Sequence, residues 1–244
     1  MNILTAICLG ILQGLTEFLP VSSSGHLVIV QSLLPGFTQP GVLFDVLLHF
    51  GTILAVIVYF RHMLFKISVK YILFLTIGSL PAAVLGFLFK SQFEAMFSSV
   101  KLVGVALLIT GGINLLTHIV KLQNSKLTPQ KSLWVGLMQA VAIIPGVSRS
   151  GSTIMAGVVA GLSAAEAAKF SFLLSIPAVL GANLLELVSH PETQINWGPY
   201  LIAPLASFLT GLLAIGTVVR FLQGKQFKYF AVYCFIVGVL ALVL

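Results

Sequence analysis

Charged residues are scarce in this chain of 244 residues: they account for 8% of it, whereas hydrophobic residues account for 58%. The mean hydropathy of +1.09 is correspondingly high. An average soluble domain carries roughly 25% charged residues, because these cover its surface. The shortage of charge therefore excludes a water-soluble globular protein and predicts an integral membrane protein.

Cysteine is also rare, and the two cysteines, Cys8 and Cys234, lie far apart inside apolar runs. This excludes a CxxC metal or redox motif and indicates that both thiols fill apolar space. The runs lack the alternation of polar and apolar residues found in barrel strands, so we expect an all-α polytopic membrane protein. Since the N-terminal run has neither a basic segment before it nor a small-residue cleavage site after it, we expect it to belong to the mature fold.

Acidic residues are outnumbered, since 13 lysines and arginines against six acids give a net charge of +7. On a soluble chain such an excess would point to nucleic acid. Here the basic residues lie in short loops between apolar runs, where they orient helices and contact anionic headgroups. We therefore expect the lipid bilayer as a partner and no nucleic acid; the sequence indicates no particular oligomeric state.

The first apolar run, Ile3 to Leu19, breaks at Pro20, and the run that follows extends only from His26 to Leu34. Nine helical residues rise about 14 Å, roughly half of the 30 Å hydrocarbon core. The second run is therefore too short to span the bilayer. We predict a re-entrant helical hairpin at residues 3–34, whose polar tip is buried in protein or lines a water-filled cavity.

Three runs of spanning length follow this hairpin, and the order of elements then repeats after a polar linker at residues 121–132. A second hairpin is predicted at residues 133–162, again followed by three spans. The six predicted spans are Val42–Phe60, Tyr71–Phe89, Leu102–Val120, Ala167–Val188, Gly198–Val219 and Phe227–Leu244. Each half, 1–120 and 133–244, is thus a hairpin plus three transmembrane helices.

Individual residues repeat as well, at a constant offset of 126 positions. The matches are Gly10 with Gly136, Gln13 with Gln139, Val21 with Val147, Ser22 with Ser148, Ser24 with Ser150, Gly25 with Gly151, and Phe44 with Phe170. Because three crossings are an odd number, the second half must enter the membrane inverted relative to the first, as in many transporters.

The loop charges test this inverted repeat. Basic residues concentrate in the loops at 61–70, 121–131 and 220–228, which alternation places on one side of the membrane, with 90–101 and 189–197 on the other. The positive-inside rule puts the first three loops in the cytoplasm and both termini outside. The first hairpin then enters from outside and the second from the cytoplasm.

Three acidic residues away from the hairpin tips have structural interpretations. Ser163 and Glu166 form a capping box at the start of the fourth span. Asp45 lies in the first turn of its span, where the helix dipole favours a carboxylate, although it could also reach the tips. Glu186, in the outer half of the fourth span, is expected to extend its carboxylate to the surface.

The first hairpin tip concentrates polar chemistry. Gln13 and Glu17 are four positions apart and share a helical face, so their oxygens suit a hard divalent cation. The polar residues that follow are Ser22, Ser23, Ser24, Gly25 and His26. Because this run leads directly into a helical arm, its hydroxyls and backbone N–H groups form either an anion site or a simple N-cap.

The second tip repeats these hydroxyls at Ser148 and Ser150 and adds the guanidinium of Arg149. An arginine at the middle of a membrane needs an anionic partner. Glu17 could be that partner in a structural salt bridge, but the surrounding hydroxyls favour phosphate. If the two tips meet, they combine an anion clamp, a nucleophile and an imidazole, His26, that can transfer protons, which are the parts for phosphoryl transfer.

Both tips resemble the signatures of the undecaprenyl pyrophosphate phosphatase family, also called the bacitracin-resistance family. Residues 13–26 are similar to its (E/Q)GxTEFLPVSSSGH block and residues 145–153 to its PGxSRSxxT block, and the resemblance covers the whole chain. It implies a membrane enzyme that hydrolyses undecaprenyl pyrophosphate to the monophosphate, recycling a cell-wall lipid carrier, with Mg²⁺ or Ca²⁺ assisting. Gln13 stands where some members have Glu, which weakens a metal site of two carboxylates.

The resemblance implies functional roles for Glu17, Ser23, His26 and Arg149, and substrate-binding positions at Ser22, Ser24, Gly25, Ser148, Ser150 and Thr153. In the mechanism that we expect, Arg149 and the cation hold the pyrophosphate, Ser23 attacks the terminal phosphorus, and Glu17 or His26 accepts the proton. Direct attack by His26 or by metal-bound water is the alternative.

A transporter or flippase for a phosphate-bearing prenyl lipid is the competing function, because inverted repeats with broken helices also build carriers. The Glu and the His beside the anion site favour hydrolysis, since a carrier needs no pair of proton-transfer groups. We expect the substrate to reach the site from the outer face, from which the first hairpin enters.

Overall fold

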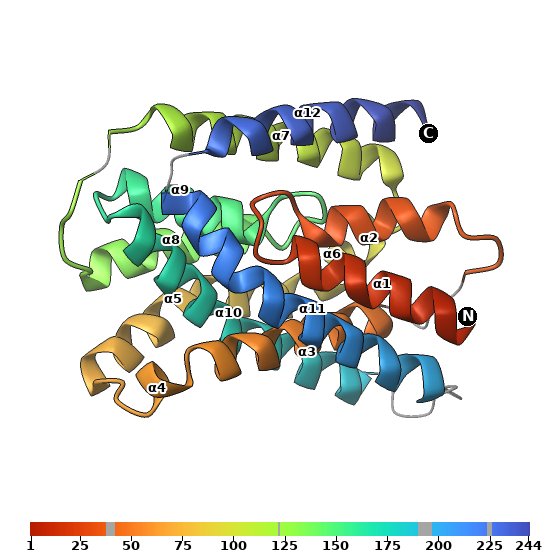
Figure 1. Cartoon of the computed structure of the whole chain (residues 1–244), viewed down its shortest axis with the longest axis horizontal. Coiled ribbons are helices and arrows are strands. Elements are labelled where there is room, and N and C mark those ends of the chain that lie inside the picture. Colours follow the sequence, from red (N-terminus) through yellow and green to blue (C-terminus); the bar gives the residue numbers. More distant parts are fainter. Residues whose placement is uncertain (38–41, 122, 190–196, 224–225) are drawn as a thin grey trace.

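The computed structural model describes residues 1–37, 42–121, 123–189, 197–223 and 226–244, and all regular structure in these ranges is helical. The first half contains α1 (Ile3–Thr16), α2 (Ser23–Ser32), α3 (Leu43–Tyr59), α4 (Arg61–Leu64), α5 (Val69–Leu88), α6 (Lys90–Met96) and α7 (Val100–Ile119) (Figure 1). The second half contains α8 (Pro129–Val141), α9 (Arg149–Val159), α10 (Ala164–Ser189), α11 (Trp197–Gln223) and α12 (Phe227–Val243). The prediction of an all-α fold is confirmed.

Each helix that the apolar runs predict is present, with boundaries that differ from the prediction by at most four residues. The sequence did not predict α4 and α6, two short helices in the connections on either side of α5. The predicted repeat in the order of elements is visible once these two are set aside: a helical hairpin and three long helices occur twice. The division at residues 121–132 into two inverted halves stays a prediction.

The long helices identify a multi-pass membrane protein. Among the described residues, four segments are long and apolar enough to cross a bilayer, Val69–Leu88, Val100–Ile119, Ala164–Glu186 and Trp197–Phe221. The other two predicted spans, α3 and α12, are apolar helices of 17 residues. At 1.5 Å per residue these reach about 25 Å, near the lower limit for a transmembrane helix.

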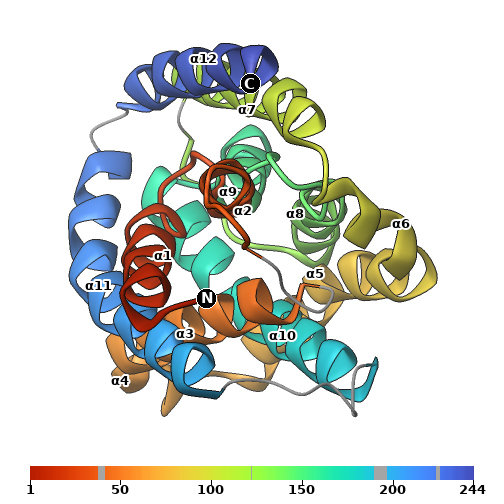
Figure 2. The same ribbon diagram turned by 90° about the vertical axis from the view of Figure 1, so that its right-hand side faces the viewer.

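The two hairpins occupy the centre of the molecule, and the longer helices surround them (Figure 2). The first arm of each hairpin packs on a long helix of the other half: α1 of the first half lies along α11 of the second, and α8 of the second half lies along α5 of the first. Glycines permit both contacts. A Cβ atom at Gly10 would lie 2.3 Å from the carbonyl oxygen of Ala203, and one at Gly136 would lie 2.4 Å from that of Gly78.

Both termini lie at one end of the molecule, at the right of Figure 1, while α4 and the start of α8 lie at the opposite end. This agrees with the predicted placement of both termini on one side and of the loops at 61–70 and 121–131 on the other. Residues 190–196 and Lys225, which the loop-charge prediction also used, lie outside the described residues.

Glu186 does not extend to the surface, so this prediction is wrong. It is 1% exposed, and its carboxylate accepts a hydrogen bond from the backbone N–H of Val42 and pairs with Lys90 at 3.0 Å. Partial burial lowers the pKa of the Lys90 ammonium, but hydrogen bonds to Glu186 and Glu94 outweigh it, so the pKa is raised above its usual value. This cluster joins the start of α3, the end of α10 and α6.

The interpretations of two other acidic residues agree with the structure in part. Ser163 caps α10 by accepting a hydrogen bond from the backbone N–H of Glu166, while the Glu166 carboxylate pairs with Lys169. Asp45 lies in the first turn of α3, as the helix-dipole interpretation requires, and is 2% exposed. It accepts a hydrogen bond from Gln31 of α2 at 2.5 Å, which ties the first hairpin to α3.

Candidate active site

The two hairpin tips meet in the middle of the molecule. The Ser150 hydroxyl donates to the carbonyl oxygen of Leu19 in the first tip at 2.9 Å. Helix α7 holds both tips: Asn114 donates to the carbonyl oxygen of Pro20 at 2.6 Å, and Thr110 donates to that of Gly146 at 2.8 Å. The contact that the sequence predicted between the tips is therefore present.

The two return arms begin in the same way. The Ser22 hydroxyl accepts a hydrogen bond from the backbone N–H of Gly25 at 3.3 Å, and the Ser148 hydroxyl accepts one from Gly151 at 3.0 Å. The first helical residues of α2 and α9 are consequently Ser23 and Arg149, which are equivalent in the repeat. Because two helix N-termini converge here beside several serine hydroxyls, the junction of the tips favours an anion.

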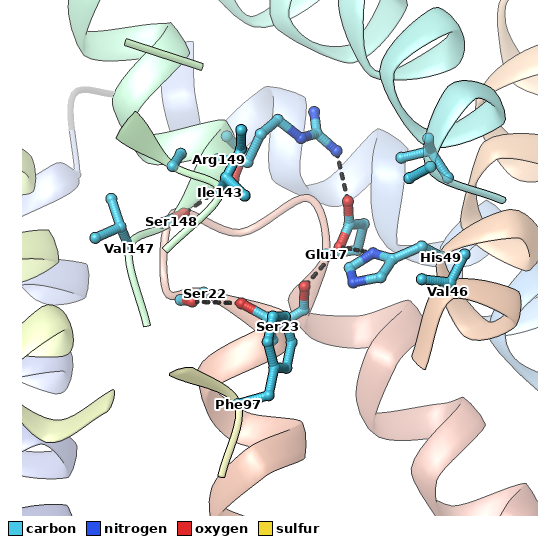
Figure 3. A pocket seen from close by; sticks show the side chains of 15 residues that line it. Glu17, Ser22, Ser23, Val46, His49, Phe97, Ile143, Val147, Ser148 and Arg149 are labelled. Carbon is cyan, nitrogen blue, oxygen red and sulfur yellow. Dashed lines mark hydrogen bonds and ion pairs between the residues drawn. The ribbon is translucent and has the colours of Figure 1, made fainter. Parts of the chain in front are cut away.

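Glu17 lies at the centre of this junction and is 6% exposed. One carboxylate oxygen, Oε1, contacts the Arg149 guanidinium at 2.5 Å (Figure 3). The other, Oε2, accepts a hydrogen bond from the Ser23 hydroxyl at 2.5 Å and one from the Gln13 amide at 2.8 Å. The carboxylate thus joins the Ser23 hydroxyl on one side to the Arg149 guanidinium on the other.

His49 is a site residue that the sequence analysis missed. Its Nδ1 atom lies 3.0 Å from Glu17 Oε2 and 2.7 Å from the amide nitrogen of Gln13. The available signal was an imidazole inside the first apolar span, where a polar group needs a partner. Without the fold, nothing indicated that this partner is Glu17.

The polar residues line a pocket of about 160 Å³. This volume has room for a small polar headgroup. The polar residues of its lining are Glu17, Ser22, Ser23, Ser24, His49, Ser148, Arg149 and Ser150. The apolar residues of its lining are Val46, Phe97, Ala142, Ile143, Val147, Val179 and Ala182. The lining therefore provides hydrogen bonds and charge together with apolar surface.

Four predicted site residues lie outside the pocket lining: Gln13, Gly25, His26 and Thr153. The Thr153 hydroxyl is engaged with Ser171 of α10 at 2.6 Å. His26 uses both ring nitrogens, Nδ1 on the carbonyl oxygen of Ser22 and Nε2 on the Tyr233 hydroxyl, each at 2.7 Å. This geometry supports the backbone of the tip and engages both ring nitrogens of His26; its predicted catalytic role stays a prediction.

Ser22 explains why the tip needs such support. Among the described residues it is the one non-glycine residue with a positive φ, 66°. This left-handed conformation is costly for an L-residue other than glycine. The hydrogen bond from His26 to the Ser22 carbonyl oxygen helps hold it, and the same turn brings Ser23 onto Glu17.

The residues predicted to hold a divalent cation do not form a resident cation site. Both oxygens of Glu17 already accept hydrogen bonds, and one of them pairs with Arg149. Gln13 turns its amide nitrogen toward Glu17, while its buried Oε1 lacks a hydrogen-bond partner. Among the described residues, no group of three His, Cys, Asp or Glu side chains could hold a metal. Glu17 is a single carboxylate and already neutralises the Arg149 guanidinium, so it is a poor ligand for Mg²⁺ or Ca²⁺.

Comparison with known proteins shows similarity along nearly the whole chain. The profile of the family described as bacitracin resistance protein BacA matches residues 6–240. The undecaprenyl-diphosphatase of Syntrophotalea carbinolica is 42% identical, over 98% of this chain and 97% of the relative. That of Halothermothrix orenii is 41% identical, over 100% and 98%. That of Korarchaeum cryptofilum is 40% identical, over 98% of each.

Proposed function

Since the chain belongs to the BacA family of bacitracin resistance proteins, we propose that the junction of the two hairpin tips is the active site of an undecaprenyl-diphosphatase. The enzyme hydrolyses undecaprenyl diphosphate to undecaprenyl phosphate and inorganic phosphate, which recycles the lipid carrier. The observation that carries the assignment of the site is Glu17, which accepts a hydrogen bond from Ser23 on one oxygen and pairs with Arg149 through the other.

Substrate binding rests on Arg149 and the two helix N-termini. The guanidinium can donate two parallel hydrogen bonds to a phosphate group, and its present partners are one oxygen of Glu17 and the carbonyl oxygen of Ser171. The hydroxyls of Ser22, Ser24, Ser148 and Ser150 are within the same pocket and supply further hydrogen bonds. The diphosphate binds among the polar residues of the pocket lining, and the prenyl chain leaves the pocket along its apolar residues.

The reaction proceeds in two displacements. In the first, the Ser23 oxygen bonds to the terminal phosphorus, the bridging P–O bond breaks, and undecaprenyl phosphate leaves with that electron pair. Glu17 Oε2 accepts the hydroxyl proton, for which its hydrogen bond is already aligned. In the second, water attacks the phosphoserine, inorganic phosphate departs, and the proton on Glu17 returns to the Ser23 oxygen.

The divalent cation, Mg²⁺ or Ca²⁺, belongs to this proposal in a narrower form than the sequence suggested. Because the protein offers it only one carboxylate, already paired with Arg149, the cation would be held mainly by the diphosphate oxygens. When bound there, it would neutralise charge on the substrate.

The site assignment is tested by phosphate release from a prenyl diphosphate, with purified protein in detergent. Ser23→Ala is expected to lower kcat about 1,000-fold, since the nucleophile is lost. Ser24→Ala, which removes the neighbouring hydroxyl from the same pocket, is the control and is expected to change kcat less than about tenfold. Near-normal release by Ser23→Ala would rule out the serine nucleophile. No release by the wild-type protein would favour the carrier function.

We further infer that the protein lies in the cell membrane with both termini outside and that the pocket opens to the outer face. Three apolar residues of the pocket lining support this orientation: Val46 lies near the start of α3, Ala182 near the end of α10, and Phe97 beside α6. These positions share one end of the molecule with the termini. A cysteine at Ser24, in a background without Cys8 and Cys234, should react with impermeant reagents from outside; labelling only from the cytoplasm would contradict this orientation.

A further inference from the structure

Each oxygen of the Glu17 carboxylate has its own contacts, and the reaction changes the contacts of the two oxygens differently. On Oε1, the restraint is Arg149, at 2.5 Å. On Oε2, it is Ser23 at 2.5 Å, Gln13 at 2.8 Å and His49 at 3.0 Å. With the diphosphatase reaction as the premise, the substrate competes with Glu17 for Arg149, because a diphosphate carries more negative charge than a carboxylate. The Ser23 hydroxyl also leaves Oε2 when its oxygen attacks phosphorus.

Gln13 and His49 are the contacts that survive both changes. Gln13 lies one turn before Glu17 on the same helix, so it moves with the tip that it would have to restrain. His49 belongs to a different element, α3, and contacts Glu17 where both residues line the pocket (Figure 3).

The backbone of α3 is fixed at this point. The Ser207 hydroxyl of α11 donates to the carbonyl oxygen of Leu48 at 2.9 Å, and the Thr52 hydroxyl donates to that of His49 at 2.7 Å. Leu48 is fully buried in an apolar cluster between α1, α3 and α11. His49 is therefore attached to a rigid part of the scaffold, which is what a group that holds another in place requires.

We propose that His49 is a positioning residue, which keeps the Glu17 carboxylate directed at Ser23 after Arg149 has turned to the substrate. It acts by donating its Nδ1–H to Oε2, the tautomer in which Nδ1 does not accept from the Gln13 amide, and it does not itself contact the reacting atoms. Without it, Glu17 is free to follow the guanidinium toward the substrate, and the alignment with the Ser23 hydroxyl is lost. The inference rests on the proposed function.

The kinetic test compares His49→Ala and His49→Gln with the wild-type enzyme. His49→Ala is expected to lower kcat about 10- to 100-fold, as misplacement of a catalytic group does, while KM changes less than about threefold. His49→Gln, which restores an amide donor, should recover most of the lost kcat. The exposed His62 on α4 provides a matched control, since His62→Ala should leave both constants unchanged. An unchanged kcat in His49→Ala, or no recovery in His49→Gln, overturns the proposal.

A double-mutant cycle with Glu17→Gln tests the contact itself, independently of activity. Measured as the change in Tm without substrate, the effects of His49→Ala and Glu17→Gln should be non-additive, because both remove the same interaction. Additive changes in Tm overturn the proposal. A wild-type protein that releases no phosphate contradicts the proposed function instead, and the cycle then decides on the His49 contact alone.

Discussion

Gln13 is the residue that sets the charge of this site. It donates to Glu17 and contacts His49, and it leaves its own amide oxygen buried without a partner. A glutamate of nearly the same size in its place would put a second carboxylate against Oε2 of Glu17. Two carboxylates this close repel each other unless a proton or a cation lies between them. We therefore expect the side chain at position 13 to decide whether the tip can hold a resident cation.

Gln13→Glu is accordingly expected to convert the site into one that binds a divalent cation. Phosphate release by the variant should reach half of its maximum at a free Mg²⁺ concentration at least about tenfold lower than in the wild-type enzyme. Its Tm should fall in EDTA and recover with Mg²⁺, whereas the wild-type Tm should respond little. Gln31→Glu is the matched control, because Gln31 donates to the Asp45 carboxylate away from the pocket lining. Identical Mg²⁺ curves for Gln13→Glu and the wild type would contradict the prediction.

A substitution of His26 distinguishes a structural role of this residue from a role in proton transfer. His26→Ala removes the hydrogen bonds to the Ser22 carbonyl oxygen and the Tyr233 hydroxyl, and unmaking buried hydrogen bonds costs about 1–3 kcal/mol. We expect kcat and Tm to fall together, and the pH dependence of kcat to keep its shape. Tyr233→Phe, which removes one of these contacts, should lower both less. A titration limb that disappears from the pH profile of His26→Ala, with Tm unchanged, would instead show that His26 transfers a proton.

At the scale of helices, the close contacts of α1 with α11 and of α8 with α5 depend on glycine. In a membrane, helices cannot gain the hydrophobic free energy of water exclusion from each other, so close approach of small residues drives their packing. Gly136 lies against the backbone of Gly78, and a Cβ atom there would lie 2.9 Å from the Gly78 Cα. Neither backbone can yield without moving a hairpin arm.

Gly136→Ala is therefore expected to destabilise the protein by about 1–3 kcal/mol, the usual cost of overpacking. Gly112 on α7 is the matched control, since a Cβ atom there would meet no atom within 4 Å. Gly112→Ala should be neutral or stabilise its helix by up to about 1 kcal/mol. Thermal or denaturant unfolding in detergent measures both variants. Equal effects of the two substitutions would show that the crossing tolerates a methyl group.

The sequence predicted the helices and much of the site because both follow local rules. Apolar length predicted the long helices, while α2 begins at Ser23, three residues before the predicted His26, because Ser22 caps it. A salt bridge from Glu17 was one of the two partners considered for Arg149, beside the favoured phosphate, and it is the partner present. His49 and Glu186 were not assigned their roles, because their partners, Glu17 and Lys90, lie on other elements, and local sequence does not encode distances between helices.

At the scale of the whole molecule, the two halves are interwoven. The arm α1 packs on α11 and the arm α8 packs on α5, so each half supplies the support for the hairpin of the other. Ser132 of α8 donates to the carbonyl oxygen of Phe74 in α5, and Ser207 of α11 donates to that of Leu48 in α3. Gln13 and Asn114 are fully buried in the assembled protein. An isolated half would expose such polar groups to lipid, which costs free energy.

Neither half is therefore expected to fold alone, whereas both together should restore activity. A cut before Ser125 suits this test, because the Ser125 backbone and hydroxyl both donate to the carbonyl oxygen of Gly161 and tie the end of the linker to the second half. Fragments 1–124 and 125–244, expressed separately, should be degraded or aggregate; expressed together, they should co-purify and release phosphate. Arg149→Ala in the second fragment should abolish that activity and leave co-purification intact, since it removes one ion pair between the halves and leaves the packing of α1 on α11 and of α8 on α5 in place. A single half that purifies as a protease-resistant, monodisperse species would contradict the interwoven fold, because it would show that α1 or α8 does not need the helix that the other half provides.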